Sequence, residues 1–236
     1  MKINRLALRL CMCALVLLRA LSLYADGKDS LSRKMIHMAG IDVKPAYVFP
    51  THEFFAGNNA TFSPIRKNLS VHLKYGFKFA PDTYFGRMYP HAVQGIGVGY
   101  NTFFHSSELG NPWSVYAFQT SRIASLTPRL SLDYEWNFGA SFGWKKYDAE
   151  SNPYNRVVGS KMNAYIHLSF LLNWQLDAQT NLRAGIGATH FSNGNTAYPN
   201  AGVNTLGASI GLTRYFGGTS RATLADGSSG IVRRPP

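Results

Sequence analysis

Residues 162–176, MNAYIHLSFLLNWQL, alternate between apolar and mostly polar side chains over their whole length. The even positions are Met162, Ala164, Ile166, Leu168, Phe170, Leu172, Trp174 and Leu176, and the odd positions are Asn163, Tyr165, His167, Ser169, Leu171, Asn173 and Gln175. Successive side chains of a β-strand point to opposite faces. The period of two therefore predicts one long strand with an apolar face and a mostly polar face.

The same period recurs along the chain. It is clear at 69–79 and 130–144, and weaker versions cover 41–50, 93–104, 112–123, 180–191 and 203–216. Most of these segments reach the roughly 9–11 residues that a tilted strand needs to cross a bilayer. Together they predict an all-β fold, an eight-stranded antiparallel transmembrane β-barrel of the outer-membrane type, over residues 26–216.

Alternation alone leaves open which face of the barrel lies inside. A soluble lipocalin-like barrel would have the same number of strands but would turn its apolar face inward. Aromatic residues near strand ends favour the membrane barrel, because they resemble interfacial girdles: Trp113, Trp136, Trp144, Trp174, Tyr215 and Phe216. The opposite face carries small, polar and charged residues, among them Asp133 and Glu135, as the packed interior of a small barrel would.

The two ends of the chain are expected to lie outside the barrel. Residues 1–25 have a basic start, an apolar run from Leu10 to Leu23 and small residues near Ala25, which predicts a secretory signal peptide. Both cysteines, Cys11 and Cys13, fall inside this segment. The tail at 217–236 has few apolar residues and is expected to be disordered. Export and a barrel together predict the outer membrane of a Gram-negative-type bacterium.

The chain is strongly basic, with a formal net charge of +12. The predicted signal holds four bases and no acids, which leaves 20 bases against 12 acids in the remainder. Export argues against nucleic acid as a partner. Anionic glycolipids of the cell envelope fit better, while ordinary solubility charge is the alternative explanation.

The stretch THFSNGNTAYPNAGVN, residues 189–204, joins the last two predicted strands. An even-stranded barrel keeps both termini in the periplasm, so odd-numbered strands run outward and this stretch forms an external loop. The even-numbered residues of both strands are apolar away from the loop. His190, Ser192 and Asn204 also have even numbers and so belong to the same face. These polar side chains would then face the lipid near the outer rim. They could simply lie beyond the hydrocarbon edge, where polarity costs little.

The other interpretation is a nucleophile with its base. Residues two apart on a strand share a face at about 6.5–7 Å, so His190 could take the Ser192 hydroxyl proton as the serine attacks an ester carbonyl. At the outer leaflet, such a pair would meet acyl chains and their ester links. No cluster of metal ligands competes with this interpretation, since His72 and His167 lie on the predicted interior faces of other strands.

The sequence HFSNGNTAYPNAGVN resembles the motif of the lipid A 3-O-deacylase (PagL-type) family, whose relatives include acyloxyacyl hydrolases. The family's His-x-Ser-Asn corresponds to His190, Ser192 and Asn193, and its Pro-Asn pair and following glycine correspond to Pro199, Asn200 and Gly202. The resemblance implies an outer-membrane barrel that hydrolyses an acyl ester, at the 3-position of lipid A, on its outer wall. It implies that His190 is the base and Ser192 the nucleophile, with Asn193, Asn200 and Gly202 forming the oxyanion and substrate-positioning groups.

One position departs from the family's pattern. The third catalytic residue of the family is a glutamate, and Asn204 stands at that position. Asparagine can orient an imidazole but cannot stabilise an imidazolium with negative charge. Asp148 and Glu150, in the preceding external loop, are candidates for a replacement carboxylate.

The predicted partner is therefore lipid A of lipopolysaccharide in the outer leaflet, with no metal and no cofactor. Basic residues in or near the external loop could hold its phosphates: Lys145, Lys146, Arg156 and Lys161. Two other functions stay open: a non-catalytic structural or adhesion barrel that has lost its third catalytic residue, and a barrel that transfers lipid. The oligomeric state also stays open, a homodimer included.

Overall fold

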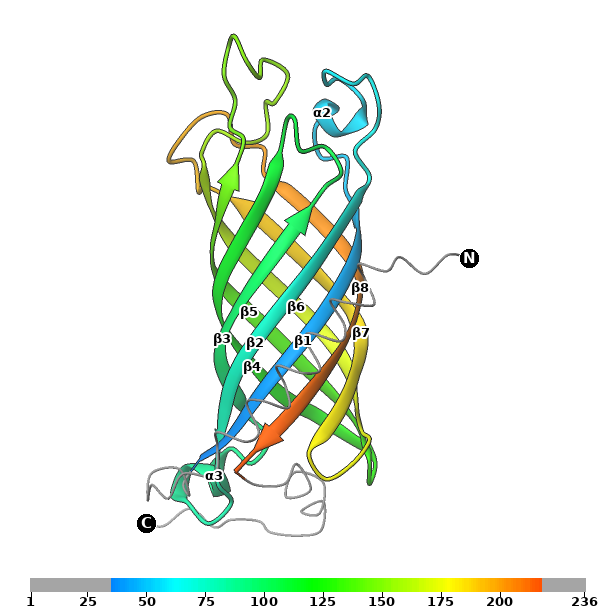
Figure 1. Cartoon of the computed structure of the whole chain (residues 1–236), viewed down its shortest axis with the longest axis vertical. Helices are drawn as coiled ribbons and strands as arrows, with labels where there is room; N and C mark the ends of the chain where they lie inside the picture. Colours follow the sequence, from blue (N-terminus) through cyan, green and yellow to red (C-terminus); the bar gives the residue numbers. More distant parts are fainter. Residues whose placement is uncertain (1–34, 218–236) are drawn as a thin grey trace.

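The computed structural model describes residues 35–217. Within them, eight antiparallel strands form one closed barrel in which each strand pairs with its neighbours in the sequence and β1 pairs with β8 (Figure 1). The strands are β1 (Met35–Val48), β2 (Lys67–Phe79), β3 (Val93–Thr102), β4 (Gly110–Thr127), β5 (Leu130–Trp144), β6 (Met162–Gln175), β7 (Thr180–Ser192) and β8 (Val203–Phe216). The predicted fold class is confirmed. The predicted signal peptide and the tail beyond Gly217 lie outside the described residues.

The two ends of the barrel differ in their connections. At one end lie four loops, called here the long loops: residues 49–66 with the short helix α2 (Glu53–Ala56), 103–109, 145–161 and 193–202 (Figure 1). At the other end lie the connection 80–92 with the short helix α3 (Tyr84–Met88), two tight turns, the start of β1 and the end of β8. The stretch at 193–202 therefore shares its end of the barrel with the other long loops, as the alternating strand directions predict.

The apolar face of the sheet points outward. The central side chains of this face are largely exposed, with 58% for Leu73, 59% for Phe138 and 63% for Ile186. On β6, every second side chain lies on this outer face, and five of them in a row are apolar: Ile166, Leu168, Phe170, Leu172 and Trp174. A continuous apolar wall of this kind needs a lipid environment, which excludes the lipocalin-like alternative and places the barrel in the outer membrane. No helix within residues 35–217 combines the length and the apolarity needed to cross a membrane.

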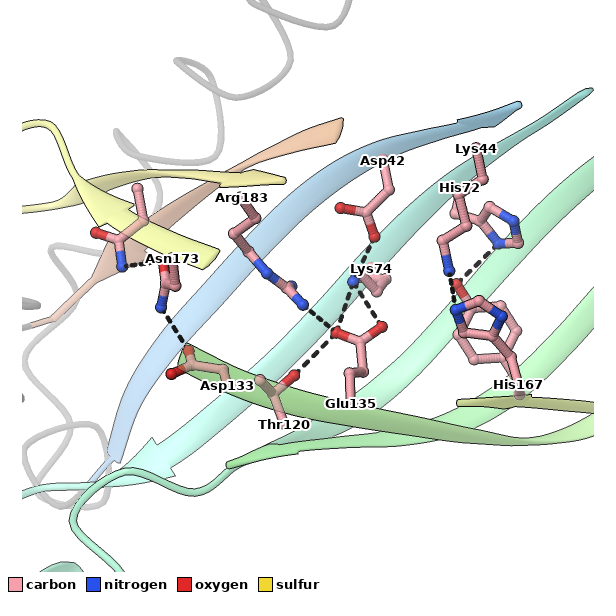
Figure 2. A network of polar contacts seen from close by, with 12 residues as sticks. Asp42, Lys44, His72, Lys74, Thr120, Asp133, Glu135, His167, Asn173 and Arg183 are labelled. Atoms are coloured by element: carbon pink, nitrogen blue, oxygen red, sulfur yellow. Dashed lines mark hydrogen bonds and ion pairs between the residues drawn. The ribbon is translucent and has the colours of Figure 1, made fainter. Parts of the chain in front are cut away.

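The middle of the barrel interior holds a network of buried charges (Figure 2). Glu135 accepts hydrogen bonds from Lys74 at 3.0 and 2.9 Å and from Thr120 at 2.9 Å, and it forms an ion pair with Arg183. Lys74 also pairs with Asp42. These charges come from strands on opposite sides of the barrel, so the network joins the walls. The prediction of a packed polar interior is confirmed for this layer.

Above and below this layer, apolar side chains pack among further buried polar ones, such as Asn101 and Ser114 towards the long loops and Lys78 and Asp133 towards the other end. Towards the long loops, Phe103, Trp144 and Phe191 pack together, with Trp144 at 5.5 and 5.1 Å from the other two ring centroids. Towards the other end, Ile36 and Met38 belong to the same buried core. Apolar clusters thus lie on both sides of the charge network.

Three aromatic residues assigned to the lipid-facing girdle are buried instead: Trp144, Tyr215 and Phe216. For Trp144 the reason is local. Gly143 has φ +87, a left-handed conformation, and the pairing between β4 and β5 shifts register between Gly110 and Trp113. The parity of the strand changes there, and Trp144 turns inward, where its Nε1 donates to Ser141 at 2.8 Å. Trp113, Trp136 and Trp174 are exposed, as predicted.

The first strand also begins earlier than the alternation predicts, at Met35 rather than at residue 41. Ile36 and Met38 point into the barrel and are only 4% and 1% exposed. Apolar residues therefore occupy both faces of the strand at this end. The period of two disappears from the sequence although the strand continues.

Candidate active site

Strand pairing brings the histidine and asparagine of the candidate site together. His190 on β7 lies directly opposite Asn204 on β8, and its Nδ1 is 2.7 Å from the Asn204 Oδ1. An amide oxygen only accepts hydrogen bonds, so Nδ1 carries the proton and donates it. In the neutral imidazole, Nε2 is then left with a free lone pair. This is the tautomer that a general base needs.

Ser192 lies two residues further along β7, on the same outer face as His190. Its Oγ is 3.0 Å from the backbone nitrogen of Gly194 and 3.4 Å from the Nδ2 of Asn200, and both groups donate towards it. Among residues 35–217, no hydrogen bond joins Ser192 to His190. His190 and Ser192 are therefore neighbours on one face of the strand. The hydrogen bond that would carry the proton from Oγ to the imidazole is not formed in this state. Catalytic hydrogen bonds often tighten only when substrate is bound.

The loop after Ser192 is organised by its two asparagines. The backbone nitrogen of Asn193 donates to the Oδ1 of Asn200 at 3.1 Å, and the Asn193 side chain donates to the Ala197 carbonyl at 2.8 Å. The Asn193 side chain thus holds the loop, while the Asn200 Nδ2 donates to Asn195 Oδ1 at 3.0 Å and also to Ser192 Oγ. Gly194, which sequence analysis did not single out, supplies the second donor. No side-chain pattern could have revealed that backbone group.

Gly202 lies against the imidazole. It adopts φ +73, and a Cβ at this position would lie 3.2 Å from the His190 Cε1 and 3.1 Å from the Phe191 carbonyl oxygen. Both the backbone conformation and the space favour glycine here. Gly202 therefore allows the loop to close over the ring of His190, and a larger residue would displace that ring.

The three polar side chains sit at the upper edge of the lipid-facing wall. His190, Ser192 and Asn204 are half-buried and share their face with exposed apolar residues: Ile186 and Ala188 on β7, and Leu206 and Ile210 on β8. The neighbouring strands continue this surface, because Ile166 on β6 is opposite His190 and Ala164 is opposite Ser192. On the β1 side, Tyr47 and Phe49 are exposed next to Asn204. An acyl chain lying against this wall would run past the candidate pair.

The acidic residues suggested as replacements for the missing glutamate lie elsewhere. Asp148 Oδ1 accepts hydrogen bonds from the Ser151 backbone, the Ser151 hydroxyl and the Glu150 backbone at 2.9, 2.9 and 3.1 Å. These bonds, led by the one from the Ser151 backbone, hold the pKa of Asp148 below its usual value. Asp148 therefore stabilises a turn in its own loop, and Glu150 is an exposed member of that turn. The structure brings neither acid to His190, whose partner is Asn204.

The predicted interior histidines take no part in this site. His72 contacts Tyr116 and Ser70 at 3.0 and 2.9 Å, and His167 contacts Lys44 and Thr189 at 3.1 and 2.8 Å, all inside the barrel. Within residues 35–217, no three or more His, Cys, Asp or Glu side chains are grouped so that they could hold a metal ion.

The fold defines the class of eight-stranded outer-membrane barrels. The chain belongs to the lipid A 3-O-deacylase (PagL) family, whose model matches residues 94–213, or 120 of the 236 residues. The match includes the motif that carried the resemblance, and the family assignment is thereby confirmed. A search of curated proteins found no match.

Three solved barrels are similar in structure to this chain. The outer membrane enzyme PagL is 12% identical with a TM-score of 0.49, and the alignment covers 73% of this chain and 97% of that one. Neisserial surface protein A (NspA) is 8% identical with a TM-score of 0.47, covering 78% and 97%. The N-terminal barrel of Pseudomonas aeruginosa OprF is 7% identical with a TM-score of 0.42, covering 78% and 98%. These comparisons do not support a homodimer.

Proposed function

We propose that this protein is an outer-membrane serine esterase that removes an ester-linked acyl chain from lipid A, with the 3-O chain as its target. The observation that carries the proposal is the 2.7 Å hydrogen bond between His190 Nδ1 and Asn204 Oδ1. It fixes the tautomer in which Nε2 can accept a proton, two residues from Ser192 on the same face. Membership of the lipid A 3-O-deacylase family supports the substrate.

The proposed reaction follows serine esterase chemistry. Substrate binding brings Ser192 Oγ within reach of His190 Nε2, which accepts the hydroxyl proton as Oγ attacks the ester carbonyl. The carbonyl oxygen becomes an oxyanion near the Gly194 backbone N–H and the Asn200 amide, the donors that converge on Ser192. His190 returns the proton to the departing sugar oxygen. Water then attacks the acyl-serine with His190 as base, releasing the fatty acid and regenerating Ser192.

Asn204 makes the proposed enzyme weaker than one with an acidic third residue. The amide orients the imidazole but provides no negative charge beside the imidazolium that forms during attack. The remaining residues would act through position: Asn193 holds Asn200 in place, and Gly202 leaves room for the His190 ring. Neither a metal ion nor a cofactor is required by this scheme.

Two observations favour a second candidate, a non-catalytic barrel. Asn204 replaces the acid of the family's motif, and within residues 35–217 Ser192 is hydrogen-bonded to loop groups rather than to His190. On this alternative, the motif would be a remnant. The protein would then contribute to the envelope through its fold alone.

Mass spectrometry of lipid A distinguishes the candidates. Refolded barrel and its Ser192→Ala variant are incubated with lipopolysaccharide in detergent, and the lipid A is weighed. The proposal predicts the loss of one hydroxyacyl chain with the native protein and no change with the variant. Equal loss with both proteins would reject Ser192 as the nucleophile. An unchanged mass with both, across several lipid A types, would favour the non-catalytic barrel, and a gain in mass would indicate acyl transfer.

A further inference from the structure

A cavity of about 820 Å³ lies between three of the long loops. Its walls include Glu53 and Asn58 from the first loop, Tyr154 and Arg156 from loop 145–161, and Tyr198 and Asn200 from loop 193–202. This volume falls in the range of about 300–1,000 Å³ that is typical of small-molecule sites. Unlike the lipid-facing wall next to Ser192, the cavity is lined by many polar groups.

Fixed contacts hold the walls of this cavity. Gly159 lies so close to loop 193–202 that a Cβ would be 2.4 Å from the Pro199 carbonyl oxygen. Asn155 donates to the Glu108 and Lys145 carbonyls at 2.8 and 2.9 Å, which anchors the base of loop 145–161. The rings of Phe62 and Tyr154 join the first loop to loop 145–161 at a centroid distance of 6.4 Å. The cavity is therefore largely preformed.

The polar side chains in the cavity are available to a ligand. Within residues 35–217, the side chains of Glu53, Asn58 and Arg156 form no hydrogen bond or ion pair with another residue. Arg156 is held with its guanidinium 5.6 Å from the Tyr147 ring centroid, which leaves its N–H groups free. Tyr154 and Tyr198 are 40% and 92% exposed. Flat rings beside carboxylate, amide and guanidinium groups suit a saccharide, whose ring has apolar faces and a polar edge.

Asn200 connects this cavity to the candidate nucleophile. It lines the cavity and donates its Nδ2 to Ser192 Oγ at 3.4 Å. In an acyl ester of a sugar hydroxyl, the ester oxygen is bonded directly to a carbon of the sugar ring. A substrate with its carbonyl at Ser192 must therefore place its sugar next to the serine. The cavity begins at Asn200, which contacts the serine on the side of the loops.

From this juxtaposition we infer that the cavity is a saccharide subsite. It binds the phosphorylated glucosamine disaccharide of the glycolipid, while the acyl chain lies along the outer wall. Arg156 binds a phosphate group, and Tyr154 stacks on a sugar ring. The inference rests on the proposed function, because it assigns the head group of the same substrate to these loops.

The first test compares two ester substrates. Arg156→Ala and Tyr154→Ala are assayed with lipid A and with a sugar-free p-nitrophenyl ester of a long-chain acid. Loss of a charge-assisted hydrogen bond predicts a rise of about tenfold or more in KM for lipid A with Arg156→Ala, and no change for the sugar-free ester. Arg129→Ala, an exposed base in the turn between β4 and β5 at the other end of the barrel, is the control and should affect neither substrate. Equal effects on both substrates, or none with lipid A, would overturn the inference.

A binding measurement separates failure of the subsite from failure of the proposed enzyme. The fully deacylated disaccharide bisphosphate of lipid A is titrated into refolded Ser192→Ala barrel and followed by calorimetry. Saturable binding that Arg156→Ala weakens about tenfold and Arg129→Ala leaves intact supports the subsite, even if no ester is cleaved. Absence of saturable binding, or equal weakening by both variants, would reject the subsite while leaving hydrolysis at Ser192 to its own test.

Discussion

Replacing Asn204 by aspartate should increase esterase activity. The two side chains have the same shape, so the carboxylate would keep an oxygen about where the amide Oδ1 now lies, 2.7 Å from His190 Nδ1. The imidazole would keep its orientation and its tautomer. The new element is a negative charge beside the imidazolium that forms when Ser192 loses its proton.

The size of the effect follows from the position of the pair. Two unit charges about 4 Å apart attract each other by about 1 kcal/mol in water and about 4 kcal/mol at an effective dielectric constant of about 20. His190 and Asn204 are half-buried, between these limits. Since about 1.4 kcal/mol corresponds to a factor of ten in rate, kcat should rise between about fivefold and about a thousandfold.

The assay measures initial rates of fatty acid release from lipopolysaccharide for the native protein, Asn204→Asp and Asn204→Glu. Asn204→Leu is a matched control, because it removes the acceptor that orients His190 and should lower the rate. Asn204→Asp combined with Ser192→Ala should be inactive. If neither acidic variant is faster than the native protein although both fold, the reasoning about charge at this position is refuted.

Three further predictions concern the site and the barrel. Gly202→Ala should lower kcat about tenfold or more, because the added Cβ would lie 3.2 Å from the His190 Cε1 and would displace the imidazole ring. Heat-modifiable gel mobility should show that this variant still folds into a barrel. Glu135→Gln should destabilise the barrel by about 3–5 kcal/mol in urea titrations, since Lys74 and Arg183 lose a buried charge partner; an equal effect from Glu150→Gln, in an exposed turn, would contradict this. Ile186→Arg should cost about 2–4 kcal/mol in a bilayer if the wall faces lipid, whereas Tyr198→Arg in the exposed loop should cost almost nothing.

The fold could be predicted because period-two alternation depends only on which face each side chain takes. The predicted start of the first strand and the predicted outward position of Trp144 were wrong, because the alternation between the two faces breaks down at both places. Ile36 and Met38 point inward, so apolar residues occupy both faces of their strand segment and it shows no alternation. Gly143 adopts a left-handed backbone that turns Trp144 from the lipid side to the interior, and no residue pattern marks that change of parity.

The site could be predicted only in part. Parity and an antiparallel hairpin were enough to place His190, Ser192 and Asn204 on one face of two adjoining strands. The direct pairing of His190 with Asn204 depends on the register of β7 and β8, which is set by the loop between them. The donors around Ser192 depend on that loop's backbone: Gly194 contributes its N–H, and the N–H of Asn193 is used by Asn200. Such backbone contacts cannot be derived from residue types alone.

Covalent labelling of Ser192 tests the central claim most directly. The refolded barrel is treated with a long-chain fluorophosphonate, which reacts with serines activated by a neighbouring base, and the intact protein and its peptides are weighed. We expect one adduct, located on Ser192, that disappears in both Ser192→Ala and His190→Ala. The absence of an adduct in the native protein, or an adduct on Ser192 that persists in His190→Ala, would contradict the assignment of these two residues as nucleophile and base.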